Sequence, residues 1–98
     1  AYELLSDESK WCQKNFAVDV RGREIFYAAP DAVRWCLDGA LKRCYTTGQD
    51  HNAYYAVYER IMNALTRDER GDSGIPSWND HPSRTHAEVY DLLKRLDI

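Results

Sequence analysis

The stretch Trp35-Cys36-Leu37-Asp38-Gly39-Ala40-Leu41-Lys42-Arg43-Cys44-Tyr45 decides most of what the sequence predicts about the fold. Together with the residues before it, this stretch repeats apolar side chains at the spacing of one helix face. They are Val33, Cys36, Leu37, Ala40, Leu41 and Cys44. Pro30 suits the first turn of a helix, and Asp31 beside it favours the positive end of the helix dipole. We therefore predict a helix from Pro30 to about Tyr45.

Gly39 lies inside this predicted helix, beside its apolar stripe. An interior glycine costs about 1 kcal/mol relative to alanine, so its presence indicates a packing reason. We predict that another part of the backbone comes close to Gly39. Cys36 and Cys44 lie on the stripe, and we expect both to be buried, unreactive thiols of the core.

Two more helices follow from the same kind of pattern. The first is predicted from about His51 to Leu65, with Asp50 as its N-cap. Its buried stripe is Tyr54, Val57, Tyr58, Ile61 and Leu65. Because only residues 46–49 separate it from the helix before it, the two should pack antiparallel.

The second of these helices should begin at Thr85. Its hydroxyl is placed to cap the helix, while Glu88, three residues later, reaches back to complete a capping box. Its apolar seam is Val89, Leu92, Leu93 and Leu96. Residues 67–77, between the two helices, are polar and contain glycine, and we predict a loop there.

The amino-terminal third has weaker patterns. Leu4, Leu5, Trp11, Cys12 and Phe16 fit a helix only if Ser6 and Asp7 do not break it. After it, apolar residues alternate with polar ones over 16–20, and an apolar run over 25–27 follows a turn at 21–23. These features predict a short β-hairpin.

Composition sets limits on the class of protein. With 98 residues the chain fits one domain, 1–98, and its 44% hydrophobic content is ordinary for a globular protein. The interspersed charges sum to −3, which makes nucleic acid an unlikely partner. No apolar run approaches the ~20 residues of a membrane span, so we expect no membrane association and a cytoplasmic location. Three cysteines without C-x-x-C spacing predict neither a disulfide framework nor a zinc site.

Three segments of the chain together resemble a known family. They are Trp11-Cys12-Gln13, Trp35-Cys36-Leu37-x-Gly39-Ala40-Leu41, and Trp78-Asn79-Asp80-x-Pro82-x-Arg84-Thr85 ahead of Glu88-Val89. In this order they are similar to a group of small bacterial and phage proteins classed as a domain of unknown function, over roughly residues 11–45 and 75–95. The resemblance implies an architecture and no activity, so no catalytic residue is carried over from it.

The best candidate for a functional surface is the loop from Trp78 to His86, which leads to a predicted helix N-terminus. Its candidate ligand-binding residues are Trp78, Asn79, Asp80, His81, Arg84 and His86. Free backbone N–H groups at such an end can hold an anion. The same residues also suit a purely structural loop, in which Asn79 or Asp80 forms a turn, Trp78 anchors the core and Arg84 pairs with a carboxylate.

The sequence therefore predicts a small, mainly helical α+β domain of three to four helices with a minor β-hairpin. We expect a protein–protein interaction module without catalytic activity, cofactor or metal, because no phosphate loop, metal spacing, basic block or nucleophile setting is recognisable. One alternative is a small-molecule or anion site, or a small enzyme, with Asp80 or His81 as base and Arg84 as anion clamp. A third is a nucleic-acid binder, through the basic side chains of Arg21, Arg23, Lys42 and Arg43.

Overall fold

The computed structural model describes residues 1–46, 51–65 and 74–98. The elements in these ranges are a short 3-10 helix η1 (Glu8–Lys10), strands β1 (Ala17–Val18) and β2 (Arg34–Trp35), and helices α1 (Leu37–Tyr45), α2 (Asn52–Ala64), α4 (Ile75–Asp80) and α5 (His86–Leu96). The predicted class, mainly helical α+β with a minor antiparallel strand pair, is confirmed.

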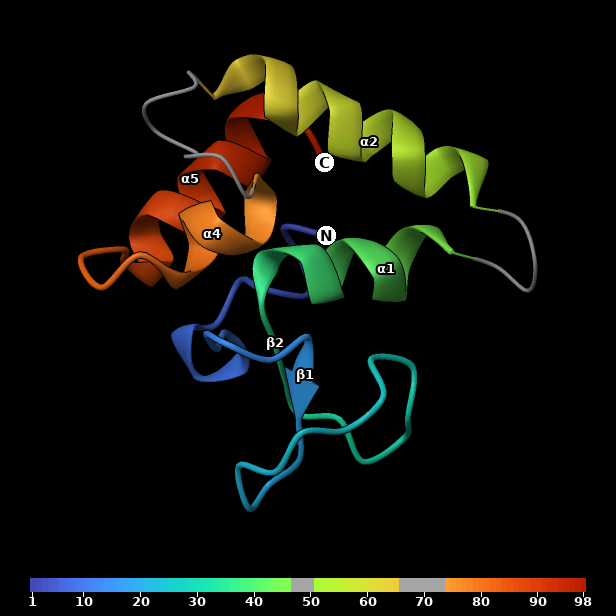
Figure 1. The fold of residues 1–98 in the computed structure, drawn as a ribbon, viewed down its shortest axis with the longest axis vertical. Coiled ribbons are helices and arrows are strands. Elements are labelled where there is room, and N and C mark those ends of the chain that lie inside the picture. Colours follow the sequence, from blue (N-terminus) through green and yellow to red (C-terminus); the bar gives the residue numbers. More distant parts are fainter. Residues whose placement is uncertain (47–50, 66–73) are drawn as a thin grey trace.

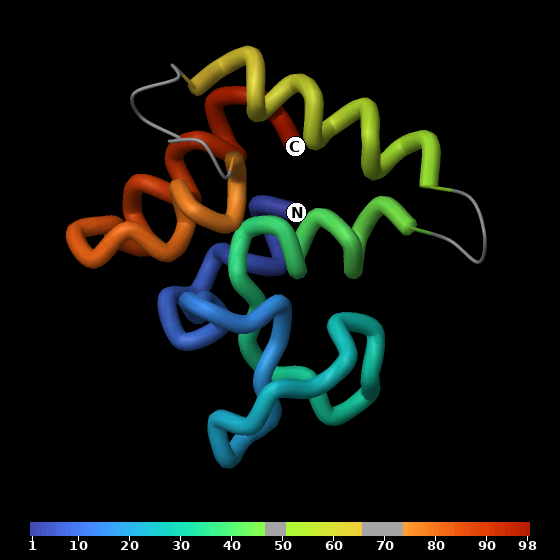
Figure 2. Tube along the Cα trace, in the orientation of Figure 1, coloured from blue at the N-terminus to red at the C-terminus, as the bar shows by residue number. Residues whose placement is uncertain are grey.

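The helices form one body, and a lobe of irregular chain extends from it (Figure 1). Helices α1 and α2 contact each other and run in opposite directions, as predicted, while α4 and α5 lie together at one end of the pair. Residues 19–33 form the lobe, which extends away from the helices in the view of Figure 2. The two chain ends meet, because the Ala1 amino group and the Tyr45 hydroxyl both donate hydrogen bonds to the carbonyl of Ile98.

Helix α1 begins seven residues later than predicted, at Leu37 rather than Pro30. Strand pairing occupies the residues before it. Trp35 pairs antiparallel with Ala17 and forms a parallel bridge with Trp11. The backbone N–H of the next residue, Cys36, donates to the carbonyl of Phe16 at 3.2 Å. These long-range hydrogen bonds hold the backbone extended. The residues before Leu37 therefore do not form a helix, although their apolar spacing fits one.

Gly39 confirms the expected close approach. A Cβ atom at this position would lie 1.8 Å from the carbonyl oxygen of Phe16, far inside contact distance. The glycine therefore lets the chain before β1 lie directly on the first turn of α1. Cys36 is the N-cap of that turn, and its sulfur accepts a hydrogen bond from the Gly39 N–H at 3.3 Å.

Only one of the two predicted core thiols belongs to the core. Cys36 is buried, but Cys44 is exposed, so its assignment to the core is wrong. Cys44 lies in the last turn of α1, beyond the buried part of the helix, which ends at Leu41. The apolar spacing in the sequence continues to Cys44, although that side chain does not pack against the core.

The predicted hairpin has the right turn and the wrong partner strand. Gly22, with a φ of +79°, and the hydrogen bond from Asp19 N–H to Arg23 carbonyl form the tight turn. Beyond the turn, Ile25 N–H donates to the Ala17 carbonyl, and only an isolated bridge joins Val18 to Glu24. The ladder partner of β1 is β2, from 34–35, instead of 25–27.

The helix considered for the amino-terminal residues does not form. Asp7 breaks it, because its carboxylate accepts the Ser9 N–H at 2.9 Å and caps η1 instead. A side chain that bonds its own neighbouring backbone competes with a continuing helix in this way.

Helices α2 and α5 agree with the predictions. The N-cap position of α2 is His51, and the predicted cap Asp50 lies outside the described residues. In α5 both halves of the Thr85–Glu88 capping box are present. The predicted loop over 67–77 lies mostly outside the described residues, but its end is wrong, since α4 begins at Ile75 with Pro76 in its first turn, where proline is tolerated.

One hydrophobic cluster unites these elements. Its fully buried members come from the amino-terminal segment, the helices and the strand region: Leu5, Ala17, Leu37, Ala40, Leu41, Ile61, Ile75, Val89 and Leu93. Trp35 and Trp78 are buried in the same cluster, and Trp11, which is partly buried, packs against it. None of the helices in the described part of the chain is long and apolar enough to cross a membrane.

Candidate functional site

The predicted functional loop forms a buried polar contact centred on Asn79, at the end of α4. The side chain of Asn79 is completely buried. Its Oδ1 accepts hydrogen bonds from Trp11 Nε1 at 2.8 Å and from the Leu37 backbone N–H at 3.0 Å. Its Nδ2 donates to the Cys12 carbonyl at 3.2 Å and to Asp80 Oδ1 at 3.0 Å. These four bonds use the whole capacity of the amide, two acceptor and two donor positions.

Residues 13 and 14 complete this contact. Gln13 Nε2 donates to the carbonyls of Asn79, at 2.9 Å, and His81, at 3.0 Å. Lys14 has a positive φ of 75°, and its backbone N–H donates to Asp80 Oδ1 at 2.8 Å. The segment 11–14 is therefore joined to the carboxyl end of α4 at several points. We call these residues, 11–14 with 78–81 and Leu37, the polar junction.

Arg84 is held by three internal contacts. Its Nε donates to the Trp78 carbonyl at 2.9 Å, its guanidinium lies 4.0 Å from the centre of the Trp78 ring, and its Nη1 pairs with Glu88 at 2.8 Å. Glu88 in turn accepts the Thr85 backbone N–H, and this hydrogen bond is the main cause that lowers the pKa of the Glu88 carboxyl. The arginine considered as an anion clamp therefore already has a carboxylate partner.

The two histidines of the loop do not meet. His81 is exposed and accepts the Ser83 backbone N–H on its Nδ1 at 3.0 Å. His86 contacts the carbonyl of Leu5 through Nε2 and stacks on Tyr90, with the ring planes 13° apart. Among the described residues, no group of three or more His, Cys, Asp or Glu is arranged to hold a metal ion.

Among the candidate residues, Trp78 thus contacts Arg84, and Asn79 contacts Asp80. His86 lies against the amino-terminal segment instead. Most of the polar groups in the loop bond the protein itself. This arrangement favours the structural interpretation of the loop, and ligand binding there stays a prediction. Trp78 Nε1 is an exception, being buried without a hydrogen-bond partner among the described residues.

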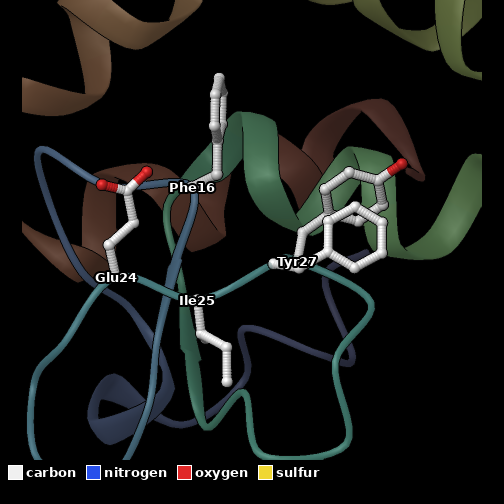
Figure 3. A pocket seen from close by; sticks show the side chains of 5 residues that line it. Phe16, Glu24, Ile25 and Tyr27 are labelled. Atoms are coloured by element: carbon white, nitrogen blue, oxygen red, sulfur yellow. The ribbon is translucent and has the colours of Figure 1, made fainter.

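A second surface was missed by sequence reasoning, and it consists mainly of aromatic side chains, several of which are exposed. Phe26 is 63% exposed and Tyr55 is 64% exposed, with Phe16 also exposed. Phe16, Glu24, Ile25, Phe26 and Tyr27 line one open hollow. In Figure 3 the Phe16 and Glu24 side chains point to the same side of the chain, whereas Ile25 points away from them.

A second hollow shares Tyr27 with the first. Its other lining residues are Lys42, Thr46, His51, Tyr54 and Tyr55. Lys42 joins the two parts, since its Nζ lies 4.0 Å from the centre of the Phe16 ring and 5.9 Å from that of Tyr54. We call Phe16, Phe26, Tyr27, Lys42, Tyr54 and Tyr55 the aromatic face.

A buried hydrogen bond supports this face from behind. The Tyr54 hydroxyl donates to Asp38 Oδ1 at 2.6 Å, which ties α2 to the first turn of α1. Burial raises the pKa of the Asp38 carboxyl, and burial together with the hydrogen bond to Asp38 raises the pKa of Tyr54. Tyr54 is therefore fixed and neutral at ordinary pH, whereas most of the Tyr55 side chain beside it meets solvent.

The basic residues considered for nucleic acid lie on two different segments. Arg21 and Arg23 belong to the turn of the lobe, and Lys42 and Arg43 to the last turn of α1. Lys42 is moreover engaged with the rings of the aromatic face. The structure adds no support for a nucleic-acid site.

The fold and these surfaces define a small, mainly helical α+β domain with a buried polar junction on one side and exposed aromatic rings on another. The chain belongs to DUF6197, a family of unknown function whose model matches residues 1–96. Neither a curated protein nor a solved structure matches the chain. Membership in the family supplies no activity for this chain.

Proposed function

We propose that this chain is a protein–protein interaction module whose binding surface is the aromatic face. The observation that carries the proposal is the exposure of Phe26 and Tyr55, which line two hollows that share Tyr27. Large apolar rings left in contact with water cost free energy, and covering them releases it. Aromatic side chains are also the residues that most often dominate protein interfaces.

Several features of the face suit a protein partner. Lys42, close to two of its rings, places a positive charge inside the apolar area, and Glu24 adds a carboxylate at the edge of the first hollow. An interface of this kind combines apolar anchors with a polar rim. The alternative site at 78–86 has less support, because Asn79 and Arg84 already have internal partners. A cytoplasmic location and a bacterial or phage origin remain predictions of the sequence.

The test uses a photo-crosslinking phenylalanine analogue placed at position 26 of the full chain, expressed in its native host. A crosslinked protein is identified, purified and titrated against the parent chain and the variants Phe26→Ala and Tyr55→Ala. We expect each variant to weaken the Kd about tenfold or more, since truncating a central interface anchor costs about 2 kcal/mol or more and a tenfold change in Kd corresponds to about 1.4 kcal/mol. Val20→Ala is the matched control, because Val20 is also exposed but lines neither hollow of the aromatic face.

The proposal predicts that Val20→Ala changes the Kd less than twofold, about the size of an ordinary surface substitution. It would be overturned if Phe26→Ala and Tyr55→Ala bound the partner as tightly as the parent. Absence of any crosslinked protein at position 26, with the analogue shown to be incorporated and the domain folded, would count against it equally.

A further inference from the structure

The two Trp-Cys pairs of the sequence lie side by side in the structure. Trp11 and Trp35 form a parallel bridge, and the Cys12 N–H donates to the Trp35 carbonyl at 3.1 Å. Each tryptophan is followed by a cysteine, so Cys12 and Cys36 occupy the next position on two adjacent segments. Neighbouring strands lie about 4.8 Å apart, and a disulfide needs Cα atoms about 4.4–6.8 Å apart. The parallel pairing therefore gives the two cysteines a backbone separation that a disulfide accepts.

Both cysteines also bond to the same short piece of backbone, residues 15 and 16, Cys36 through its N–H to the Phe16 carbonyl at 3.2 Å. Cys12 Sγ lies 3.5 Å from the Asn15 carbonyl oxygen. Cys36 Sγ accepts the N–H of Gly39, and Gly39 lies directly against the carbonyl of Phe16. The thiols are close enough that a charge on Cys12 contributes to raising the pKa of Cys36. All three cysteines lie in the described residues, and all three are free thiols.

We propose that Cys12 and Cys36 are a redox pair that closes into a reversible intramolecular disulfide. The oxidant is a small disulfide of the glutathione type. The Cys12 thiolate attacks one sulfur of oxidised glutathione, which forms a mixed disulfide and releases one glutathione thiolate. The Cys36 thiolate then attacks the Cys12 sulfur and releases the second glutathione thiolate. Two protein thiols lose two protons and two electrons, and one glutathione disulfide becomes two glutathione thiols.

Differences in exposure assign the order of attack. Cys12 is only half-buried and meets the oxidant first, while Cys36 is 4% exposed and acts as the resolving thiol from inside. Burial raises the pKa of Cys12 to about 11 and that of Cys36 to about 12. Only the thiolate reacts, so closure is slow at neutral pH and its rate rises about tenfold for each pH unit up to those values.

The disulfide would tie the amino-terminal segment to the start of α1 and enclose the lobe between two covalently joined ends. Cross-linking restricts the unfolded chain, so the oxidised domain is the more stable form. The redox state therefore changes how firmly the lobe is anchored to the helical body, without any new contact at the aromatic face itself.

The experiment uses the full chain carrying Cys44→Ser, which removes the exposed thiol and with it disulfides between molecules. The folded protein is incubated with oxidised glutathione at pH 8, alkylated, digested with trypsin and analysed by mass spectrometry. We expect the peptides Trp11–Lys14 and Trp35–Lys42 to be joined, in a protein lighter by two hydrogen atoms and without bound glutathione. Dithiothreitol should restore both thiols. The oxidised form should melt several degrees higher, and closure should be about tenfold slower at pH 7.

Matched controls are Cys12→Ser and Cys36→Ser, each in the Cys44→Ser background. Cys12→Ser should leave Cys36 largely unmodified while the protein is folded, and Cys36→Ser should stop at the mixed disulfide on Cys12. The proposal is overturned if the folded parent accumulates glutathione on Cys12 while Cys36 stays alkylatable. It is equally overturned if the joined peptides form only when urea unfolds the chain.

Discussion

The polar junction and the aromatic face contrast sharply. The junction contains asparagine, aspartate, glutamine and histidine, yet Asn79 at its centre is fully buried and every hydrogen-bonding position of its side chain is used. The aromatic face contains phenylalanine and tyrosine, yet Phe26 and Tyr55 are mostly in solvent. The polar residues stabilise this fold, whereas part of the apolar surface stays in contact with solvent. In these two regions, therefore, the polarity of a residue does not indicate whether its side chain is exposed to solvent.

The largest expected effect concerns the glycine where the two regions meet. Gly39→Ala would place a methyl group against the carbonyl of Phe16, at a site with no space for it. We expect a loss of about 3 kcal/mol or more in the free energy of unfolding, because the clash is with backbone. Urea denaturation measures it.

Gly22→Ala is the matched control in the turn of the lobe. Gly22 has a positive φ, and a methyl group there would meet no other atom within 4 Å, so only backbone strain of about 1–2 kcal/mol is expected. If Gly22→Ala lowered the free energy of unfolding as much as Gly39→Ala does, that result would contradict the claim that close packing makes Gly39 the more sensitive position.

A smaller effect is expected at the cap of α5. Thr85→Ala removes the hydroxyl that accepts the Glu88 N–H, and we expect a loss of about 1 kcal/mol. Thr85→Ser keeps the hydroxyl and should retain most of the stability. Equal denaturation midpoints for the parent and Thr85→Ala would mean that the capping box contributes nothing to the junction side of the molecule.

The smallest effect is a change in pH dependence behind the aromatic face. Burial raises the native pKa of Asp38 above its ordinary 3.8, although the Tyr54 hydroxyl and Lys42 oppose the shift. The folded state then binds the proton more tightly than the unfolded state, so the contribution of Asp38 to stability falls as pH rises from 3.8 through the native pKa. Asp38→Asn should lose this part of the slope, as measured by urea unfolding between about pH 3.5 and pH 7. An unchanged slope would show that Asp38 ionises as freely in the fold as in the unfolded chain.

Local chemistry made part of the fold predictable. The capping box of α5 was predicted from two residues three positions apart, and the buried stripe of α2 from the spacing of one helix face. The close approach at Gly39 was predicted from the cost of a glycine inside a helix. Each of these signals lies within a few residues of the feature that it predicts. Their predictions were confirmed.

The rest depends on contacts between distant residues. The start of α1 was misplaced because Trp35 pairs with Ala17 and Trp11, which no local pattern reveals. The role of Asn79 depends on Trp11, 68 positions away, so the candidate loop was located without its partners. The aromatic face was missed because apolar alternation around β1 indicated a half-buried hairpin, whereas the chain after the turn pairs only briefly and leaves Phe26 exposed.

The most direct test of the contrast is a comparison of Asn79→Ala with Phe26→Ala by urea unfolding. Asn79→Ala leaves Trp11 Nε1 and the Leu37 N–H without their acceptor, and we expect it to cost roughly 2–4 kcal/mol. Phe26→Ala removes a mostly exposed ring and should cost less than about 1 kcal/mol. The opposite order, with Phe26→Ala the more destabilising of the two, would contradict the assignment of the junction to stability and of the aromatic face to binding.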